Sequence, residues 1–261
     1  HDAGGAEILS SYVRRRRVEC LLVLAGPAVA IFARKLGPIE VTDPGKAMNE
    51  CDWVLCGSSY PSDFELKFLA KAKSRGKPSV VFLDHWINYR ERFLRNGTET
   101  LPDEIWVGDA DAERIARESL PDMPVTLVKN PYFEDLRADL NSRRGRLRRS
   151  TKVRALFLSQ PIHRYSPLDD SDIANAYTEH DALRYLFAHL SSLEKRVDEV
   201  MIRLHPSEVA DKYDWAVGAF ETPVLIDEDR ELIDAILSAD YVLGMDSMAM
   251  VVGLLAKKEV I

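Results

Sequence analysis

The sequence VDEVMIRLHPSE, residues 197–208, indicates the fold of this chain more directly than any other stretch. Residues 197–202 are largely apolar and predict a buried β-strand. Pro206 ends that strand and fixes the turn, so His205 is expected to be held in place. Open α/β sheets bind ligands at the carboxyl edge of their strands, where Arg203 and His205 would meet an anionic, phosphorylated ligand. A salt bridge within the protein is the alternative for Arg203.

Short apolar runs alternate with longer amphipathic runs on both sides of this stretch. We predict strands near residues 19–25, 39–42, 52–56, 78–83, 104–107, 125–128, 153–158, 197–203, 223–226 and 241–243. We predict helices near residues 5–16, 27–36, 61–75, 109–119, 178–192, 209–218, 231–237 and 247–256. This alternation is typical of parallel, doubly wound sheets, so the predicted class is α/β.

The polar, Arg-rich segment 141–152 separates two such series. We therefore predict a Rossmann-like domain over residues 1–140, a basic linker over 141–152 and a second Rossmann-like domain over 153–261, with a cleft between the domains. The first residues look like a strand-to-helix turn without its strand, and the last look like a strand that is just beginning. Flanking secondary structure is therefore expected to be missing at both ends.

The composition is that of an ordinary globular chain, with 46% apolar and 30% charged residues. No apolar run approaches the roughly 18 residues of a membrane span, and no signal peptide is visible. Cys20, Cys51 and Cys56 form no CxxC pair, which favours free thiols in a reducing cytoplasm. Cys20 lies in a predicted strand and is expected in the core.

The net charge of −7 argues against a nucleic-acid partner. Two basic clusters, at residues 14–17 and 143–149, run against this overall charge. They are interpreted as a solvated helix end and a linker, with attraction to an anionic acceptor or to the cytoplasmic membrane surface as the alternative.

A glycine-rich turn opens the chain, with Asp2, Gly4 and Gly5 in the sequence HDAGGA. Glycines at a helix start let backbone amides approach an anionic ligand closely. The turn matches neither GxGxxG nor a P-loop, so a tight turn without a ligand is an equal alternative.

The predicted strand 78–83 runs directly into Asp84 and His85. A carboxylate beside an imidazole suits general-base chemistry, because each group biases the protonation of the other. Trp86 and Tyr89 follow, and could either stack on a sugar or base or anchor the loop.

Two further strand ends in the second half carry polar residues. Ser159 and Gln160 end the first strand there, where their donors and acceptors would suit a ligand, although a plain turn is a rival. Asp246 and Ser247 precede the last helix and could cap it or, with its free amides, bind phosphate. Glu208 is grouped with the ligand contacts around His205.

Metal binding is not predicted, because the histidines share no ligand spacing and there is no HExxH motif. No GxSxG nucleophile elbow is present either.

Taken together, the Gly-rich first turn, Arg-x-His-Pro at 203–206 and Gly-x-Asp-Ser at 244–247 resemble GT-B glycosyltransferases. The nearest resemblance is to the bacterial group with a His-Pro and a later Ser motif, which includes sialyltransferases, polysialyltransferases, capsule Kdo transferases and CDP-glycerol glycerophosphotransferases. It implies metal-independent, inverting transfer from a CMP-, CDP- or UDP-linked sugar to a glycan or lipid-linked acceptor, in bacterial surface polysaccharide or glycan synthesis. The nucleotide sugar is a co-substrate, so no cofactor is implied, and the expected location is the cytoplasm or the inner face of the membrane.

The resemblance also implies roles for single residues. His205 and Ser247 would contact the donor phosphate in the second domain. The base that deprotonates the acceptor would come from the first domain, with Asp84 as first choice and Asp2 as second.

Two departures keep other functions open. Val251 and Val252 stand where many sugar-nucleotide enzymes carry an acidic residue, and the paired-acid-Gly base motif of polysialyltransferases is not evident. The alternatives are a nucleotide-sugar 2-epimerase or hydrolase of the same fold, although epimerases usually carry an acidic pair near the late Ser, and a non-catalytic nucleotide-sugar-binding protein.

Overall fold

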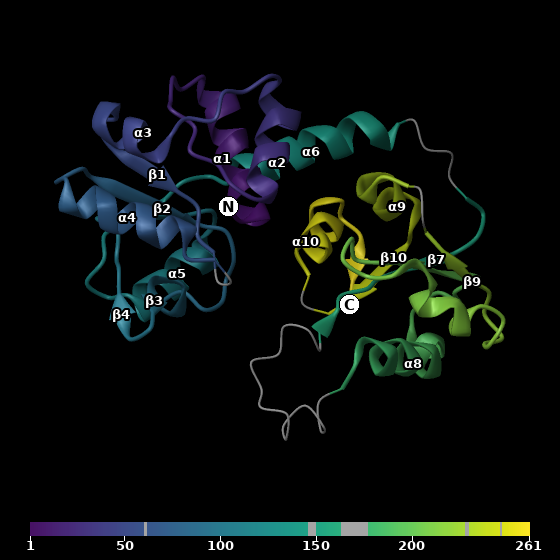
Figure 1. Cartoon of the computed structure of the whole chain (residues 1–261). Coiled ribbons are helices and arrows are strands. Elements are labelled where there is room, and N and C mark those ends of the chain that lie inside the picture. Colours follow the sequence, from purple (N-terminus) through teal and green to yellow (C-terminus); the bar gives the residue numbers. More distant parts are fainter. Residues whose placement is uncertain (60–61, 146–149, 163–176, 228–229, 246) are drawn as a thin grey trace. The chain divides into compact units, whose positions relative to one another are not determined.

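The computed structural model describes residues 1–59, 62–145, 150–162, 177–227, 230–245 and 247–261 (Figure 1). The chain divides into two compact units, His1–Asp135 and Leu136–Ile261. Each unit has its own parallel sheet with helices, so the predicted α/β class with two Rossmann-like domains is confirmed. Among these residues, no helix is both long and apolar enough to cross a membrane.

The first unit is built on a four-stranded parallel sheet in the order β1-β2-β5-β6. Its strands are β1 (Val54–Cys56), β2 (Ser79–Leu83), β5 (Glu104–Val107) and β6 (Val125–Leu127). Its helices are α1 (Ala3–Arg16), α2 (Pro27–Leu36), α3 (Pro44–Glu50), α4 (Phe64–Ser74) and α5 (Ala110–Ser119). Between β2 and β5 the chain forms the 3₁₀ turn η1 (Glu91–Phe93) and the short hairpin β3 (Leu94–Arg95) and β4 (Thr98–Glu99).

All five residues of β2 are buried, because β2 is an inner strand of the sheet. Val81 and Leu83 join a core with Ile105 and Val107 of the neighbouring strand and with residues of α4 and α5. Phe82 is also fully buried. A strand buried in this way leaves its next residue, Asp84, at the carboxyl edge of the sheet.

The second unit has a five-stranded parallel sheet in the order β11-β10-β7-β8-β9. Its strands are β7 (Arg154–Leu158), β8 (Glu199–Arg203), β9 (Val224–Ile226), β10 (Tyr241–Gly244) and β11 (Glu259–Val260). Its helical elements are α8 (Glu179–His189), η3 (Leu190–Ser192), η4 (Ala210–Ala216), α9 (Leu232–Ser238) and α10 (Met248–Leu255). The strand order reverses between β7 and β10, and open α/β sheets bind ligands at such a switch point.

The helix α6 (Pro131–Arg144) spans the division between the two units and includes the first residues of the predicted linker. Its last turn is tied to the second unit. The Arg143 guanidinium lies 3.1 Å from Asp234 in α9, and Arg144 donates a hydrogen bond to the Ala256 carbonyl at 2.8 Å. These two arginines of the second basic cluster therefore have partners within their own unit.

Two expectations for the first unit are wrong. The segments near 19–25 and 39–42 share only a single bridge, between Leu22 and Val41, instead of forming strands. Cys20 is exposed rather than buried, because the pairing does not extend to it and the apolar contacts of the segment are made by Leu22 and Leu24. The helix α3 was not predicted. Its sequence does carry a start signal, since Asp43 is a favoured N-cap residue and Pro44 is favoured at the first helical position.

Candidate functional site

Polar side chains gather where β1 and β2 end in the first unit. Ser58 and Ser59 follow β1 and are buried, and Asp84 follows β2. Asp2, the N-cap of α1, reaches the same place, because its carboxylate accepts a weak hydrogen bond from the Ser59 hydroxyl at 3.5 Å. Two carboxylates and two hydroxyls thus share one sheet edge.

The Asp84 carboxylate is held through one of its two oxygens. Oδ1 accepts hydrogen bonds from Arg92 Nη1 at 2.9 Å and from the Ser58 hydroxyl at 3.3 Å. Arg92 Nη1 also lies 2.9 Å from the Ser58 oxygen, so the three groups form a closed triangle. In the described part of the chain, Oδ2 receives no hydrogen bond and points towards Gly4.

The surroundings of Asp84 favour its protonated form more than water does. Burial raises the pKa of this carboxyl, the nearby Asp2 carboxylate raises it further, and the Arg92 guanidinium opposes both by lowering it. The net direction is upward. A carboxylate with a raised pKa is a stronger base than an ordinary aspartate, which suits proton abstraction.

Gly4 and Gly5, at the start of α1, pack closely against this edge of the sheet. A Cβ on Gly4 would lie 2.0 Å from Asp84 Oδ2, and one on Gly5 would lie 3.0 Å from the Cα of Gly57. The Gly4 amide already donates to Asp2 Oδ1 at 3.0 Å. The requirement for glycine here is therefore explained by protein contacts alone.

We expect Gly4→Ala to displace the Asp84 carboxylate, because its Cβ would occupy the space of Oδ2. Overpacking costs about 1–3 kcal/mol, and the better helix propensity of alanine returns about 1 kcal/mol. A proton transfer to Asp84 should slow by about 100-fold, the effect of a misplacement of about 1 Å. Gly145→Ala is the control, since its Cβ would meet nothing within 4 Å. Equal turnover of the two variants, measured alongside urea unfolding, would contradict this geometry.

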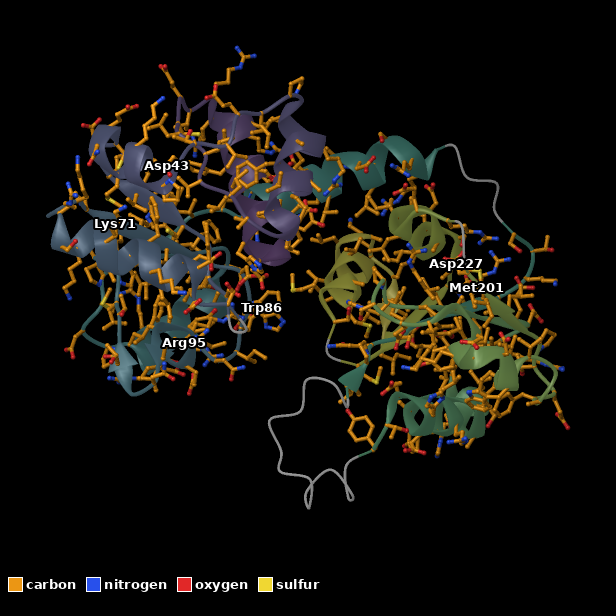
Figure 2. The ribbon with its side chains drawn as sticks, viewed as in Figure 1. Asp43, Lys71, Trp86, Arg95, Met201 and Asp227 are labelled. Carbon is orange, nitrogen blue, oxygen red and sulfur yellow. The ribbon has the colours of Figure 1, made fainter. Side chains whose placement is uncertain are left out.

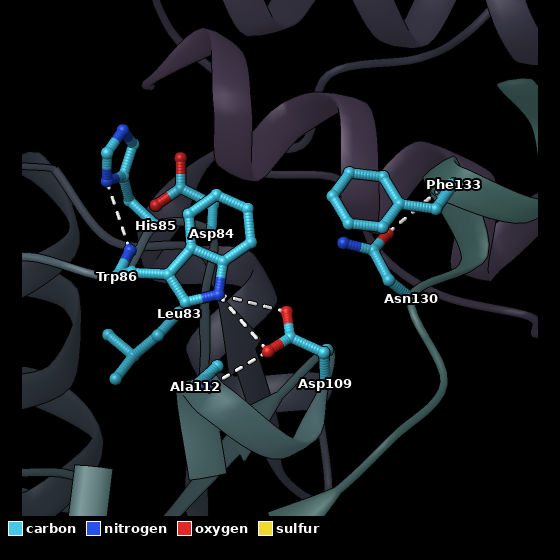
Figure 3. A pocket seen from close by; sticks show the side chains of 9 residues that line it. Leu83, Asp84, His85, Trp86, Asp109, Ala112, Asn130 and Phe133 are labelled. Atoms are coloured by element: carbon cyan, nitrogen blue, oxygen red, sulfur yellow. Dashed lines mark hydrogen bonds between the residues drawn. The ribbon is translucent and has the colours of Figure 1, made fainter. Parts of the chain in front are cut away.

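A small pocket lies beside Asp84, where β2 and β5 end (Figure 3). Trp86 Nε1 lies 3.1 Å from both oxygens of Asp109, which also caps α5 by accepting from the Ala112 amide at 2.8 Å. Of the two interpretations of Trp86, the loop anchor is therefore confirmed. His85 Nδ1 accepts the Trp86 amide at 3.0 Å, which leaves the ring proton on Nε2 in the neutral imidazole.

The pocket has space of about 10 Å³ for the centres of water-sized molecules, which is room for about one water. A sugar is much larger than this space. A group as large as a sugar could therefore reach Asp84 only from over the sheet edge, not inside the pocket.

In the second unit, both carboxylate oxygens of Glu208 accept hydrogen bonds from groups of the protein. Its Oε2 accepts the His205 amide at 2.8 Å, and its Oε1 accepts from the Ser159 hydroxyl at 2.9 Å and from Lys212 Nζ at 2.5 Å. The side chain is only 2% exposed. Glu208 thus ties the turn after β8 to the end of β7, and Ser159 also contacts the Tyr213 hydroxyl at 2.6 Å.

The contacts of the His205 ring leave one of its nitrogens, Nε2, as a donor. Its Nδ1 lies 3.2 Å from the Ser207 amide, which donates to it, and 2.8 Å from the Ser207 hydroxyl. An acceptor at Nδ1 leaves the proton of the neutral ring on Nε2. Nε2–H is the group that could donate to a phosphate oxygen.

Arg203 turns away from His205 and towards the end of the neighbouring strand. Its Nη1 lies 2.7 Å from Asp227 Oδ2 and 2.6 Å from the Arg230 carbonyl oxygen. Asp227 directly follows β9 (Figure 2). The alternative of a salt bridge is therefore the arrangement observed for Arg203.

Two predicted residues lie at the switch point between β7 and β10. Gln160 follows β7, and its Oε1 is buried without a hydrogen-bond partner in the described part of the chain. Ser247 is the N-cap of α10 and accepts from the Ala249 amide at 3.2 Å. Because Gly244 pairs with Leu158, the turns that carry these two residues leave adjacent strands. Asp246 lies outside the described residues.

Four residues of these contacts were not predicted from the sequence: Arg92, Ser58, Lys212 and Tyr213. Ser58 follows a strand end, so the signal that found Asp84 could have found it. Arg92 carries no such signal, because it lies in a 3₁₀ turn eight positions after Asp84. No group of three or more His, Cys, Asp or Glu side chains that could hold a metal ion occurs among the described residues.

No protein-family model matches the sequence. No curated protein matches it either. Among solved structures, the chain is similar to the crystal structure of MurG from Acinetobacter baumannii, with a TM-score of 0.45 and 11% sequence identity over 93% of this chain and 68% of that chain. A likeness of this degree does not bear on the chemistry of this chain, which must be inferred from its own residues.

Proposed function

We propose that this protein is a GT-B-type glycosyltransferase that moves a sugar from a nucleotide to a hydroxyl of a glycan or lipid-linked acceptor. The observation that carries the proposal is the Asp84 carboxylate. It stands at a sheet edge, is held through Oδ1 by Arg92, leaves Oδ2 free of hydrogen bonds from the described residues, and has a raised pKa. These are the properties of a general base.

The donor side is proposed for the second unit. His205 Nε2–H and the Ser247 hydroxyl, at the N-terminus of α10, are donors suited to a phosphate. Preorganised donors of this kind stabilise charge that develops on the leaving group. Gln160 Oε1 at the switch point is buried and has no partner among the described residues, which supports a ligand there because buried polar atoms are nearly always paired.

The proposed reaction is a single displacement. The acceptor oxygen forms a bond to the anomeric carbon, and the bond from that carbon to the donor phosphate oxygen breaks. The electron pair leaves with the phosphate, whose charge His205, the Ser247 hydroxyl and the positive end of α10 would stabilise. The hydroxyl proton passes to Asp84 Oδ2. One displacement inverts the configuration of the anomeric carbon, and no metal ion or cofactor takes part in the proposal.

The proposed setting is surface polysaccharide or glycan synthesis in the bacterial cytoplasm, with peripheral contact to the inner face of the membrane. Arg14 and Arg15 are both engaged by Asp135, at 2.6 and 2.7 Å. Arg16 and Arg17 are exposed and remain as the part of this basic cluster suited to anionic lipids.

A panel of CMP, CDP, UDP and GDP tests the donor site through thermal unfolding. A nucleotide present at 100 times its Kd should stabilise the protein by about 2.7 kcal/mol. We expect one nucleotide to stand out, and its sugar derivatives then serve as donors in a transfer assay. If none of the four shifts the transition, the transferase proposal fails. Release of free sugar without an acceptor would identify a hydrolase instead, and binding without turnover would identify a non-catalytic binding protein.

A further inference from the structure

The chain segment between β2 and β5 carries a buried arginine, Arg92, that lies at the carboxyl edge of the sheet. Arg92 is 9% exposed and is the direct partner of Asp84, whose side chain is 10% exposed. Besides its bonds to Asp84 and Ser58, its Nε lies 3.3 Å from the Ile87 carbonyl oxygen. The guanidinium is thus held by three different groups within one small region.

The segment that carries Arg92 is anchored on both sides. Tyr89 and Phe93 are buried in the core of the first unit, three residues before it and one after it. The Thr100 amide donates to the Phe93 carbonyl at 2.8 Å, which closes the hairpin β3–β4 behind the turn. Arg95 in that hairpin, labelled in Figure 2, donates to the Ser59 carbonyl at 3.1 Å. Arg92 therefore has a fixed position relative to the end of β2.

We infer that Arg92 is a positioning residue for the base of the proposed reaction: it holds Oδ1 of Asp84, leaves Oδ2 beside Gly4 at the start of α1 to take the proton, and keeps the carboxyl ionised. This inference rests on the proposed function for its catalytic meaning. The effect of Arg92 on the ionisation of Asp84 can be measured without an activity assay.

The charges around Asp84 explain why one arginine has this effect. Asp2 faces the carboxyl from the start of α1, His85 follows it in the chain, and the Tyr89 phenol lies near enough for the Asp84 charge to raise the pKa of that phenol. Burial and Asp2 both raise the pKa of Asp84, and Arg92 is the main group that lowers it. Without Arg92, the carboxyl would hold its proton to a higher pH and could not accept one from a hydroxyl.

The test compares Arg92→Met and Arg92→Lys with Arg90→Met. Arg90 is the matched control, because it lies in the same segment and pairs with Glu99 while remaining 59% exposed. We expect the acidic limb of the kcat profile to move to higher pH in Arg92→Met, with a loss of about tenfold or more on that limb that shrinks as the pH rises. Arg92→Lys should recover part of the loss, since it keeps the charge but not the forked geometry. Arg90→Met should follow the wild type.

Unfolding in urea as a function of pH gives the second readout, independent of turnover. A carboxyl whose folded pKa is raised contributes stability below its ordinary value of 3.8, and that contribution is lost as the pH rises through the folded pKa. Removing Arg92 raises that pKa further. The urea midpoint of Arg92→Met should therefore lie below wild type at pH 8, and the deficit should shrink as the pH falls towards 4. In an Asp84→Asn background, this pH dependence should vanish.

A deficit that is the same at every pH, together with an unshifted rate profile, would overturn the inference and leave Arg92 a packing residue. Failure of the proposed function is distinguishable from this outcome. It would appear as wild-type protein without transfer activity, while the pH-dependent deficit of Arg92→Met would still report whether Arg92 controls the ionisation of Asp84.

Discussion

Asp84→Asn should lower transfer by about 10²–10⁴-fold, the range for loss of a general base. The amide keeps the size of the carboxyl and can still accept from Arg92 and Ser58 through its oxygen, so the edge of the sheet retains its shape. It cannot accept a proton from the acceptor hydroxyl. The measurement is kcat with the nucleotide sugar identified by the binding panel.

Donor binding separates this effect from a general loss of structure. The proposed donor residues belong to the second unit, so nucleotide stabilisation of Asp84→Asn in thermal unfolding should match that of the wild type. Asp43→Asn is the matched control, because Asp43 is an exposed helix cap that asparagine can replace (Figure 2). Undiminished transfer by Asp84→Asn would exclude Asp84 as the base and move the role to Asp2 or elsewhere.

His205→Ala should lower kcat by about 10²–10³-fold, the cost of removing one preorganised donor from developing charge. It should also weaken nucleotide binding by about 10- to 100-fold, since a hydrogen bond to a charged group contributes about 1.5–3 kcal/mol. The fold should persist, because the bond that holds the turn is made by the His205 backbone amide to Glu208 and survives the substitution.

Two companion variants make this result specific. His205→Gln restores a side-chain N–H donor and should recover part of the binding. His189→Ala is the control, since His189 lies on the exposed face of α8. There its ring stacks on that of Tyr185, with 4.0 Å between the ring centroids. If His205→Ala binds its nucleotide as the wild type does, in isothermal titration at constant salt, the phosphate role of His205 is wrong.

Much of the architecture could be predicted from the sequence because buried parallel strands are short apolar runs of branched residues. SVVFL at 79–83 and RALFL at 154–158 are strands β2 and β7 in the structure. Where such a run stops, the next polar residue must lie at the carboxyl edge of the sheet. Asp84, Ser159, His205 and Ser247 could therefore be placed at sheet edges without any knowledge of their partners.

The predictions that were wrong concern strand pairing and the direction of side chains. Cys20 was expected in the core because its segment has the composition of a strand, but a strand also needs neighbours, and here only Leu22 pairs. Arg203 and Glu208 were expected to face a ligand. The structure directs the first to Asp227 and the second to Ser159, Lys212 and the His205 amide.

Periodicity and turn residues in the sequence thus establish two parallel sheets and the strand ends where chemistry can occur, because these features depend on a few consecutive residues. The surroundings of each polar group depend on segments far apart in the chain. Arg92 reaches Asp84 only because Tyr89 and Phe93 are buried on either side of it, and Gly4 meets Asp84 only because α1 starts at the end of β2. The charge and orientation of the proposed base are therefore properties of the folded chain.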